Sequence, residues 1–277
     1  MTIDEMTIQK ERSGCSYKEL SKISGIPEET VRGILEKEII HINYATYEAL
    51  RQTFTSLSEK KKTEEATSSN ESYVCEDSGQ FGMTDGTGAL DRSCYFNKTV
   101  DDYLELPEEV RVELIDGVFY DMGAPDNLHQ MISGRIYNKL INYVDSHKGS
   151  CIPMIAPADV QLDHDDLTMV QPDVFVVCNR DKMQKQRTYG APDLAIEVVS
   201  PSSYDHDTIR KLDKYRRAGV REYWIVIPDD QKVLVFFFER SDKPTEYTFE
   251  DKVPVNIWND ECKVDFKQIY DIVKLWA

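Results

Sequence analysis

The sequence has no long uninterrupted hydrophobic run, and its first residues, MTIDEMTIQKERSG, contain neither a basic start nor an apolar stretch. A helix that crosses a membrane needs about 20 mostly apolar residues. A secretory signal peptide needs a positively charged start followed by an apolar segment. We therefore expect no membrane association and a location in the cytoplasm.

Closely spaced cysteine pairs are also missing. The six cysteines are scattered, with no C-x-x-C pair, at Cys15, Cys75, Cys94, Cys151, Cys178 and Cys262. Structural zinc sites and disulfide frameworks are both indicated by regular cysteine spacings. We therefore expect neither a zinc site nor disulfides, which is typical of a protein in a reducing compartment. The G-x-S-x-G motif and the P-loop are absent as well, which gives no support to a serine hydrolase or an NTPase.

Positive charge is scarce, because 33 Lys and Arg residues stand against 50 Asp and Glu residues and give a net charge of −17. Such an excess argues against a protein coated in basic surface for nucleic acid, although it leaves room for a local basic groove.

The character of the sequence changes twice along the chain. Residues 1–57 show helical periodicity, residues 58–94 are rich in Ser, Thr, Glu and Gly, and residues 95–277 alternate strand and helix signals. A segment that buries little apolar surface cannot offset its chain entropy. We therefore predict a small helical domain, a flexible linker over 58–94, and a larger α/β domain.

The larger domain opens with a predicted hairpin, Val112 to Met122, whose tight turn is Asp116-Gly117. A helix is predicted from about Asn127, because apolar residues recur at steps of four at Ile132, Ile136, Leu140 and Val144. Apolar strand candidates follow (CIPMIAPADVQL, MVQPDVFVVC, DLAIEVVS, EYWIVI and VLVFFF), with a further helix expected over 204–218. This order predicts a mixed sheet flanked by helices.

The N-terminal segment SYKELSKISGIPEETVRGIL predicts two short amphipathic helices. Leu20 and Ile23 are expected to face inward on the first helix, Gly25 to end it, and Pro27 to open the second. The predicted buried face of the second helix is Val31, Ile34 and Leu35. The segment resembles the helix-turn-helix of the Cro/repressor type.

In that fold the second helix enters the major groove of DNA, and here its candidate nucleic-acid-binding residues are Thr30, Arg32 and Lys37. Glu28 and Glu29, at the leading end of the helix, fit a phosphate backbone poorly. A small helical bundle that binds another protein, or nothing, is the alternative.

Two acidic residues carry the main hypothesis for the larger domain. Asp173 opens one apolar strand, after Gln171-Pro172, and Glu197 lies within another. A carboxylate among aliphatic residues is costly unless it is paired or binds a metal. Two of them at one sheet edge would offer oxygen ligands to Mg²⁺ or Mn²⁺. Without a cation they would repel each other, so a neutral substitution is expected to leave the metal-free protein equally or more stable.

A cation is expected beside these carboxylates, and Lys211 on the following helix is the candidate. Asp207 and Tyr215 lie four residues before and after it, which places all three on one helix face. Lys214 is expected to be a solvated charge.

From Tyr95 onward the chain resembles the Uma2 family of restriction-endonuclease-like proteins. The resemblance rests on ELIDG (113–117), the helix with His129, QPD (171–173), GAPDLAIEVVSPS (190–202), the Asp207/Lys211/Tyr215 set and AGVREYWIV (218–226). It implies the PD-(D/E)XK fold, a divalent metal and nuclease activity by analogy. That class usually has a lysine two residues after the acid. Val199 occupies this position here, so Lys211 would have to replace the missing lysine.

The sequence leaves two interpretations open for each of two further residues. Glu113 is either another ligand or an exposed strand residue, and His129 is either a capping or surface histidine or part of the active site. The sequence thus predicts a helix-turn-helix domain followed by a metal-dependent endonuclease that hydrolyses DNA, with catalytic candidates Asp173, Glu197, Lys211, Tyr215, Glu113 and His129. A non-catalytic DNA-binding regulator and a nuclease acting on RNA stay open as alternatives, as does a homodimer.

Overall fold

The computed structural model describes residues 1–67, 92–163, 165–200, 204 and 206–274. The chain divides into two compact units, Met1–Gly123 and Ala124–Ala277, which are described separately. None of the helices in these described ranges is both long and apolar enough to cross a membrane.

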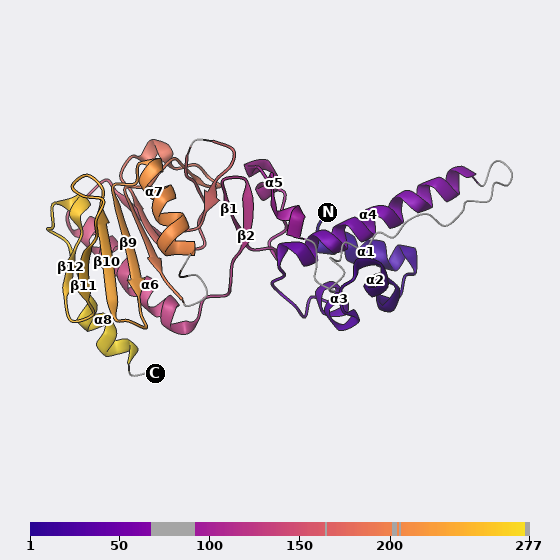
Figure 1. Ribbon diagram of the computed structural model, residues 1–277, viewed down its shortest axis with the longest axis horizontal. Coiled ribbons are helices and arrows are strands. Elements are labelled where there is room, and N and C mark those ends of the chain that lie inside the picture. The colour runs from indigo at the N-terminus through magenta and orange to yellow at the C-terminus, as the bar shows by residue number, and fades with distance from the viewer. Residues whose placement is uncertain (68–91, 164, 201–203, 205, 275–277) are drawn as a thin grey trace. The chain divides into compact units, whose positions relative to one another are not determined.

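The first unit begins with four helices: α1 (Ile3–Ser13), α2 (Tyr17–Ser24), α3 (Glu28–Leu35) and α4 (Tyr44–Thr67) (Figure 1). Ser16 forms a capping box with Glu19 at the start of α2, which satisfies backbone N–H groups that the helix leaves unpaired. Gly25 ends α2 in the left-handed conformation, as predicted. Helix α4 runs to Thr67, so the predicted linker begins in a helix; the part of that linker at 68–91 lies outside the described residues.

One predicted core residue of this unit is wrong. Ile23 is exposed, whereas Leu20 and Ser24 are buried on α2. These two residues are four apart and define the inward stripe, and Ile23 falls to its side. The turn at Gly25 then brings Ile26 into the core in place of Ile23. The predicted face of α3 is confirmed, because Val31, Ile34 and Leu35 are all buried.

The same unit ends in a short helical turn η1 (Arg92–Tyr95), helix α5 (Val100–Leu104) and the hairpin of β1 (Val112–Ile115) and β2 (Val118–Asp121). The predicted turn is confirmed, since Asp116 and Gly117 both have positive φ angles of 50° and 76°. The backbone N–H of Tyr44 donates to Asp121 Oδ1 over 2.8 Å, which fastens the hairpin to the start of α4.

The second unit is built on a six-stranded sheet in the order β11-β10-β9-β8-β6-β3. Its strands are β3 (Ile152–Ile155), β6 (Val174–Val177), β8 (Leu194–Val198), β9 (Glu222–Ile227), β10 (Lys232–Phe237) and β11 (Thr245–Thr248). Only β8 and β9 pair in parallel, so the sheet is mixed. Shorter elements are β4 (Val160–Gln161), β5 (Met169–Val170), η2 (Arg180–Lys182), β7 (Thr188–Tyr189), β12 (Lys252–Pro254), η4 (Asn256–Trp258) and β13 (Lys263–Asp265).

One face of this sheet is covered by α6 (Asn127–Ser146) and α8 (Phe266–Val273) (Figure 1). The predicted stripe of α6 is confirmed, because its four residues are buried. They pack with alternate strand residues such as Ile196, Val198 and Trp224. Successive residues of a strand point to opposite faces, so Glu197 belongs to the other face. That face carries α7 (Leu212–Ala218), whose Tyr215 contacts Glu197.

Two other features depart from the sequence predictions. The helix expected over 204–218 begins as a π-helical segment, η3 (His206–Lys211), before α7. A disulfide joins Cys151 and Cys178, contrary to the expectation of none. The pairing of Ile152 with Val177 places the two cysteines opposite each other at the next position of the β3–β6 ladder. Only strand pairing reveals this proximity, since 27 positions separate the cysteines in sequence.

A buried acid at the start of β9 is hydrogen-bonded to the segment that follows β12. Glu222 is fully buried, and its carboxylate accepts hydrogen bonds from Trp224 Nε1, from the backbone and side chain of Asn256, and from Ile257 N. Burial raises the pKa of Glu222 despite these hydrogen bonds.

Candidate functional site

The two acids singled out in the sequence meet on neighbouring strands. Strands β6 and β8 are antiparallel with Val174 opposite Ile196, and one further step of that register places Asp173 opposite Glu197. Directly opposed residues share one face of a sheet, with Cβ atoms about 4.5–5.5 Å apart. The backbone N–H of Val198 donates to Asp173 Oδ2 over 2.7 Å, which ties the Asp173 side chain to β8.

Asp173 is also held by the helix on the other side of its strand. His129, in the first turn of α6, bonds through Nε2 to Asp173 Oδ2 at 2.9 Å. Burial alone would lower the pKa of His129, but the hydrogen bond and the negative charge of Asp173 outweigh it and raise that pKa. Asp126 begins α6 by accepting a hydrogen bond from His129 N, which fixes the backbone that carries the imidazole.

Glu197 is enclosed by the helical segment that follows its strand. Lys211 Nζ and the Tyr215 hydroxyl both donate to Glu197 Oε1, over 3.0 and 2.7 Å. Asp207 Oδ1 lies 3.3 Å from the same ammonium group, so the lysine is placed between two carboxylates. The backbone carbonyl of Asp207 accepts from the Tyr223 hydroxyl, which anchors the π-helical segment to β9. This set is buried, and Tyr215 is fully so.

The two acids differ in their access to solvent. The Asp173 side chain is 16% exposed and that of Glu197 only 4%. Both hydrogen bonds described for Asp173 fall on Oδ2, which leaves Oδ1 for another ligand. Val199, at the usual lysine position of the wider nuclease class, is buried and apolar. The Lys211 ammonium group occupies the neighbourhood of the acid instead.

Lys214 is a correction, because it is buried rather than solvated. It forms an ion pair with Asp163, in the segment after β4, and so joins α7 to that segment. No local pattern predicts this pairing, since the two residues are far apart in the chain.

Other candidates lie in the first unit. Glu113 is in β1 and buried, so the reading of it as an exposed strand residue is wrong. Arg32 is exposed on α3 and pairs with Glu29, while Thr30 is half-buried. Lys37 lies beyond the end of α3, with a φ angle of 61°, and pairs with Asp4. Both cations are therefore already matched by carboxylates.

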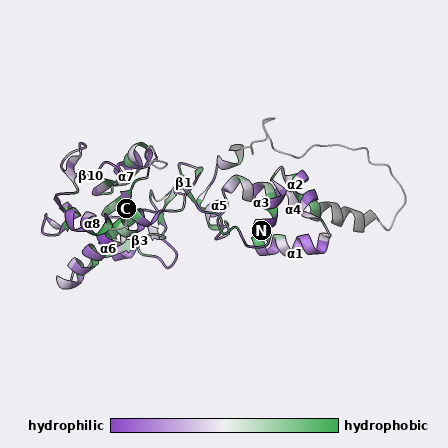
Figure 2. Cartoon of the chain, turned by 90° about the horizontal axis from the view of Figure 1, so that it is seen from below, coloured by the Kyte–Doolittle hydropathy of each residue, from purple (hydrophilic) through white to green (hydrophobic). Residues whose placement is uncertain are grey.

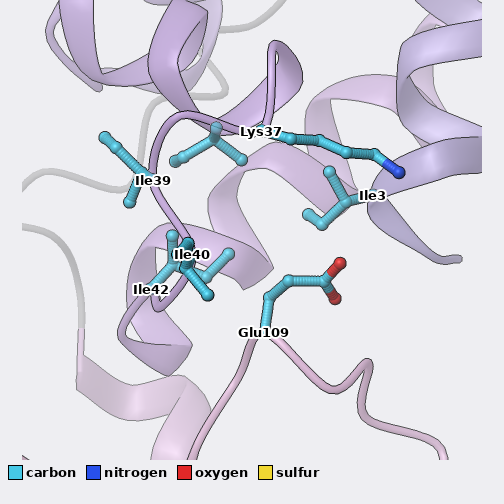
Figure 3. A pocket seen from close by; sticks show the side chains of 7 residues that line it. Ile3, Lys37, Ile39, Ile40, Ile42 and Glu109 are labelled. Atoms are coloured by element: carbon cyan, nitrogen blue, oxygen red, sulfur yellow. The ribbon is translucent and has the colours of Figure 1, made fainter. Parts of the chain in front are cut away.

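A pocket of about 160 Å³ in the first unit is mainly apolar (Figure 3). Its lining is Ile3, Ile34, Lys37, Ile39, Ile40, Ile42 and Glu109. Its two charged residues are Lys37, which pairs with Asp4, and Glu109, and its other lining residues are isoleucines.

The donor set on β6 and β8 suits one kind of metal binding. In the described ranges, no group of three or more His, Cys, Asp and Glu side chains is arranged to hold an ion. Mg²⁺ is usually bound through one or two carboxylates, with waters and substrate phosphate oxygens completing its shell. Asp173 and Glu197 fit that mode, whereas they do not fit a cage made only of protein ligands.

A mixed sheet flanked by helices, with paired acids on adjacent strands and a lysine between carboxylates, defines a restriction-endonuclease-like fold. A crystal structure of "a putative nuclease belonging to DUF820" from Anabaena variabilis has this fold, with a TM-score of 0.53 and 21% identity. The similarity covers 63% of this chain and 98% of that one.

Sequence comparison gives the family. The model of the Uma2 family, described as "Putative restriction endonuclease", matches residues 100–257, and the chain belongs to that family. The uncharacterized protein slr1290 of Synechocystis sp. is 27% identical over 146 residues, which cover 51% of this chain and 74% of that protein.

Proposed function

We propose that this protein is a metal-dependent endonuclease that hydrolyses phosphodiester bonds in DNA, with Mg²⁺ or Mn²⁺ as its cofactor. The observation that carries the proposal is the opposition of Asp173 and Glu197 on adjacent strands beside the Lys211 ammonium group. A metal at such a pair lowers the pKa of bound water and offsets charge that develops on the phosphate.

The surrounding residues have separate tasks in this proposal. His129 and the Val198 N–H orient Asp173 so that Oδ1 is presented as a ligand. Tyr215 fixes the Glu197 carboxylate through Oε1. Lys211 lies close enough to Glu197 to offset negative charge on a bound phosphate. Glu113, in the other unit, is assigned no role.

Cleavage of supercoiled plasmid by the full chain tests the proposal. With Mn²⁺ we expect nicked and linear products, and with EDTA we expect none. Asp173→Ala and Lys211→Ala should abolish the products, while Asp193→Asn is the matched control. Asp193 is also a half-buried, paired acid next to β8, but it bonds Cys178 N and Arg221 instead.

The same assay separates the alternatives. If the protein cuts a labelled RNA in preference to DNA, its substrate is RNA and not DNA. If the wild type cuts neither, the non-catalytic regulator is favoured. A second experiment follows metal binding without turnover. Mn²⁺ should raise the Tm of the wild type by mass action and leave that of Asp173→Ala unchanged.

The N-terminal helices are proposed to bind DNA as a helix-turn-helix, since α2 and α3 are short helices joined by a tight turn. Arg32→Glu should weaken duplex binding by the full chain, because Arg32 is the exposed cation of α3. Equal binding by this variant would favour a protein-binding role. The proposal extends to a homodimer that cuts both strands and to a cytoplasmic location.

A further inference from the structure

A second concave surface lies in the layer that faces away from Glu197. It is a groove of about 650 Å³ between α6, α8 and the β12–β13 hairpin. Ligand sites commonly measure about 300–1,000 Å³. Its apolar lining residues are Val264, Ile269 and Ile272, and its other lining residues have charged or amide side chains.

The α6 side of the groove is one continuous polar stripe. Arg135, Asn138, Lys139 and Asn142 are spaced at i, i+3, i+4 and i+7, so they share one helix face, and all four are exposed. Figure 2 shows hydrophilic residues along α6 that alternate with its hydrophobic ones. Because the buried stripe of α6 already packs on the sheet, the polar stripe is available to a ligand.

The charge of the groove is opposite to that of the chain. Four cations line it, Arg135, Lys139, Lys252 and Lys263, against two carboxylates, Glu261 and Asp265. Lys252 pairs with Asp265, which also caps α8. Glu261 accepts a hydrogen bond from the Tyr143 hydroxyl.

The remaining cations of the groove have no ion-pair partner among the described residues. Across the part of the chain that the structure describes, no carboxylate lies in ion-pair distance of Arg135, Lys139 or Lys263. In a chain with a net charge of −17, three such cations around one groove point to an anionic ligand.

We propose that this groove binds the phosphate backbone of a single nucleic-acid strand, at a site separate from the cleavage site. Three cations and the amide side chains of Asn138 and Gln268 supply donors for phosphate oxygens, whereas the Asn142 amide already donates to Asn138. Among the described residues that line the groove none is aromatic, so the expected contacts are to backbone phosphates, which carry no sequence information. The choice of nucleic acid as the anion rests on the proposed function.

Fluorescence anisotropy with a labelled single-stranded DNA oligonucleotide, measured in EDTA, tests this site on the full chain. Lys139→Ala/Lys263→Ala should weaken binding and reduce the slope of log Kd against log salt. The expected reduction is about 1.4, because each phosphate contact on a single strand contributes about 0.7. Lys185→Ala/Lys243→Ala removes the same charge from exposed positions outside the groove and should match the wild type.

An unchanged slope in the groove variant overturns the proposal, and so does full displacement of the oligonucleotide by an acidic peptide at equal charge. Binding in EDTA requires neither metal nor turnover. An inactive nuclease that still shows the groove-dependent slope would therefore refute the proposed cleavage and leave this site standing.

Discussion

Replacing Glu197 by glutamine probes the buried contact at the centre of the candidate site. The substitution keeps the shape of the side chain and an oxygen that can accept from Tyr215, but it removes the charge that faces Lys211. The ammonium group, 5% exposed, keeps Asp207 at 3.3 Å as a carboxylate partner. We expect Glu197→Gln to lower the stability of the metal-free protein.

The loss of stability in Glu197→Gln depends on how much negative charge still faces the Lys211 ammonium group. Removing one partner of a buried pair costs about 3–5 kcal/mol when the other charge is left uncompensated. Because Asp207 still faces Lys211, we expect about 2 kcal/mol, within the range of a poorly satisfied buried group. For a domain of this size that loss lowers Tm by about 4–8 °C.

Tryptophan fluorescence during thermal unfolding is a suitable assay, because all three tryptophans belong to the second unit by sequence position. Lys211→Met and the double variant complete a mutant cycle, in which the double variant should lose less than the sum of the single ones. Glu239→Gln is the control. Its exposed partner is Arg221, and such surface pairs contribute about 0–1 kcal/mol.

A Glu197→Gln protein as stable as the wild type, or more stable, would refute this reasoning. The sequence-based expectation of equal or greater stability gives most weight to repulsion between Asp173 and Glu197. In the structure Lys211 contacts Glu197 directly and His129 contacts Asp173, so each carboxylate already has a partner that can carry positive charge.

Two other predictions concern stability. The raised pKa of Glu222 means that folding favours the protonated form of this side chain. Its contribution to the free energy of unfolding is therefore present below the unfolded pKa near 4.5 and is lost as pH rises through the folded pKa. Urea titrations from about pH 4 upward should show this loss in the wild type, and a Glu222→Gln protein with the same pH profile would contradict it. Removal of the disulfide by Cys151→Ser/Cys178→Ser should cost about 3.5 kcal/mol, the value expected for a loop of this length. Dithiothreitol should destabilise the wild type by the same amount and leave the double variant unchanged; an equal response of both would disprove the bond.

Local patterns predicted most of the elements. The Asp116-Gly117 turn and the four-residue spacing on α6 are properties of short stretches, and both are observed. The proximity of Asp173, Glu197 and Lys211 was also predictable, because a carboxylate among aliphatic residues needs a partner. The spacing of Lys211 and Asp207 on one helix face is likewise local.

Contacts between segments that are distant in sequence could not be predicted from such local patterns. The ion pair of Lys214 with Asp163 and the bond between Cys151 and Cys178 depend on which strands and helices pack together. Ile23 shows the complementary error, since an apolar residue beside the buried stripe of a short helix looks the same in sequence as one within it.

The antiparallel pairing of β6 with β8 also bears on how related sequences can vary. The opposition of Asp173 and Glu197 depends on the register of the two strands, and not on the number of residues in the connection between them. Insertions or deletions between Asn179 and Ala191 should therefore be tolerated without separating the acids. A single residue inserted within β8 before Glu197 would instead turn this carboxylate toward α6 and the hydrophobic core.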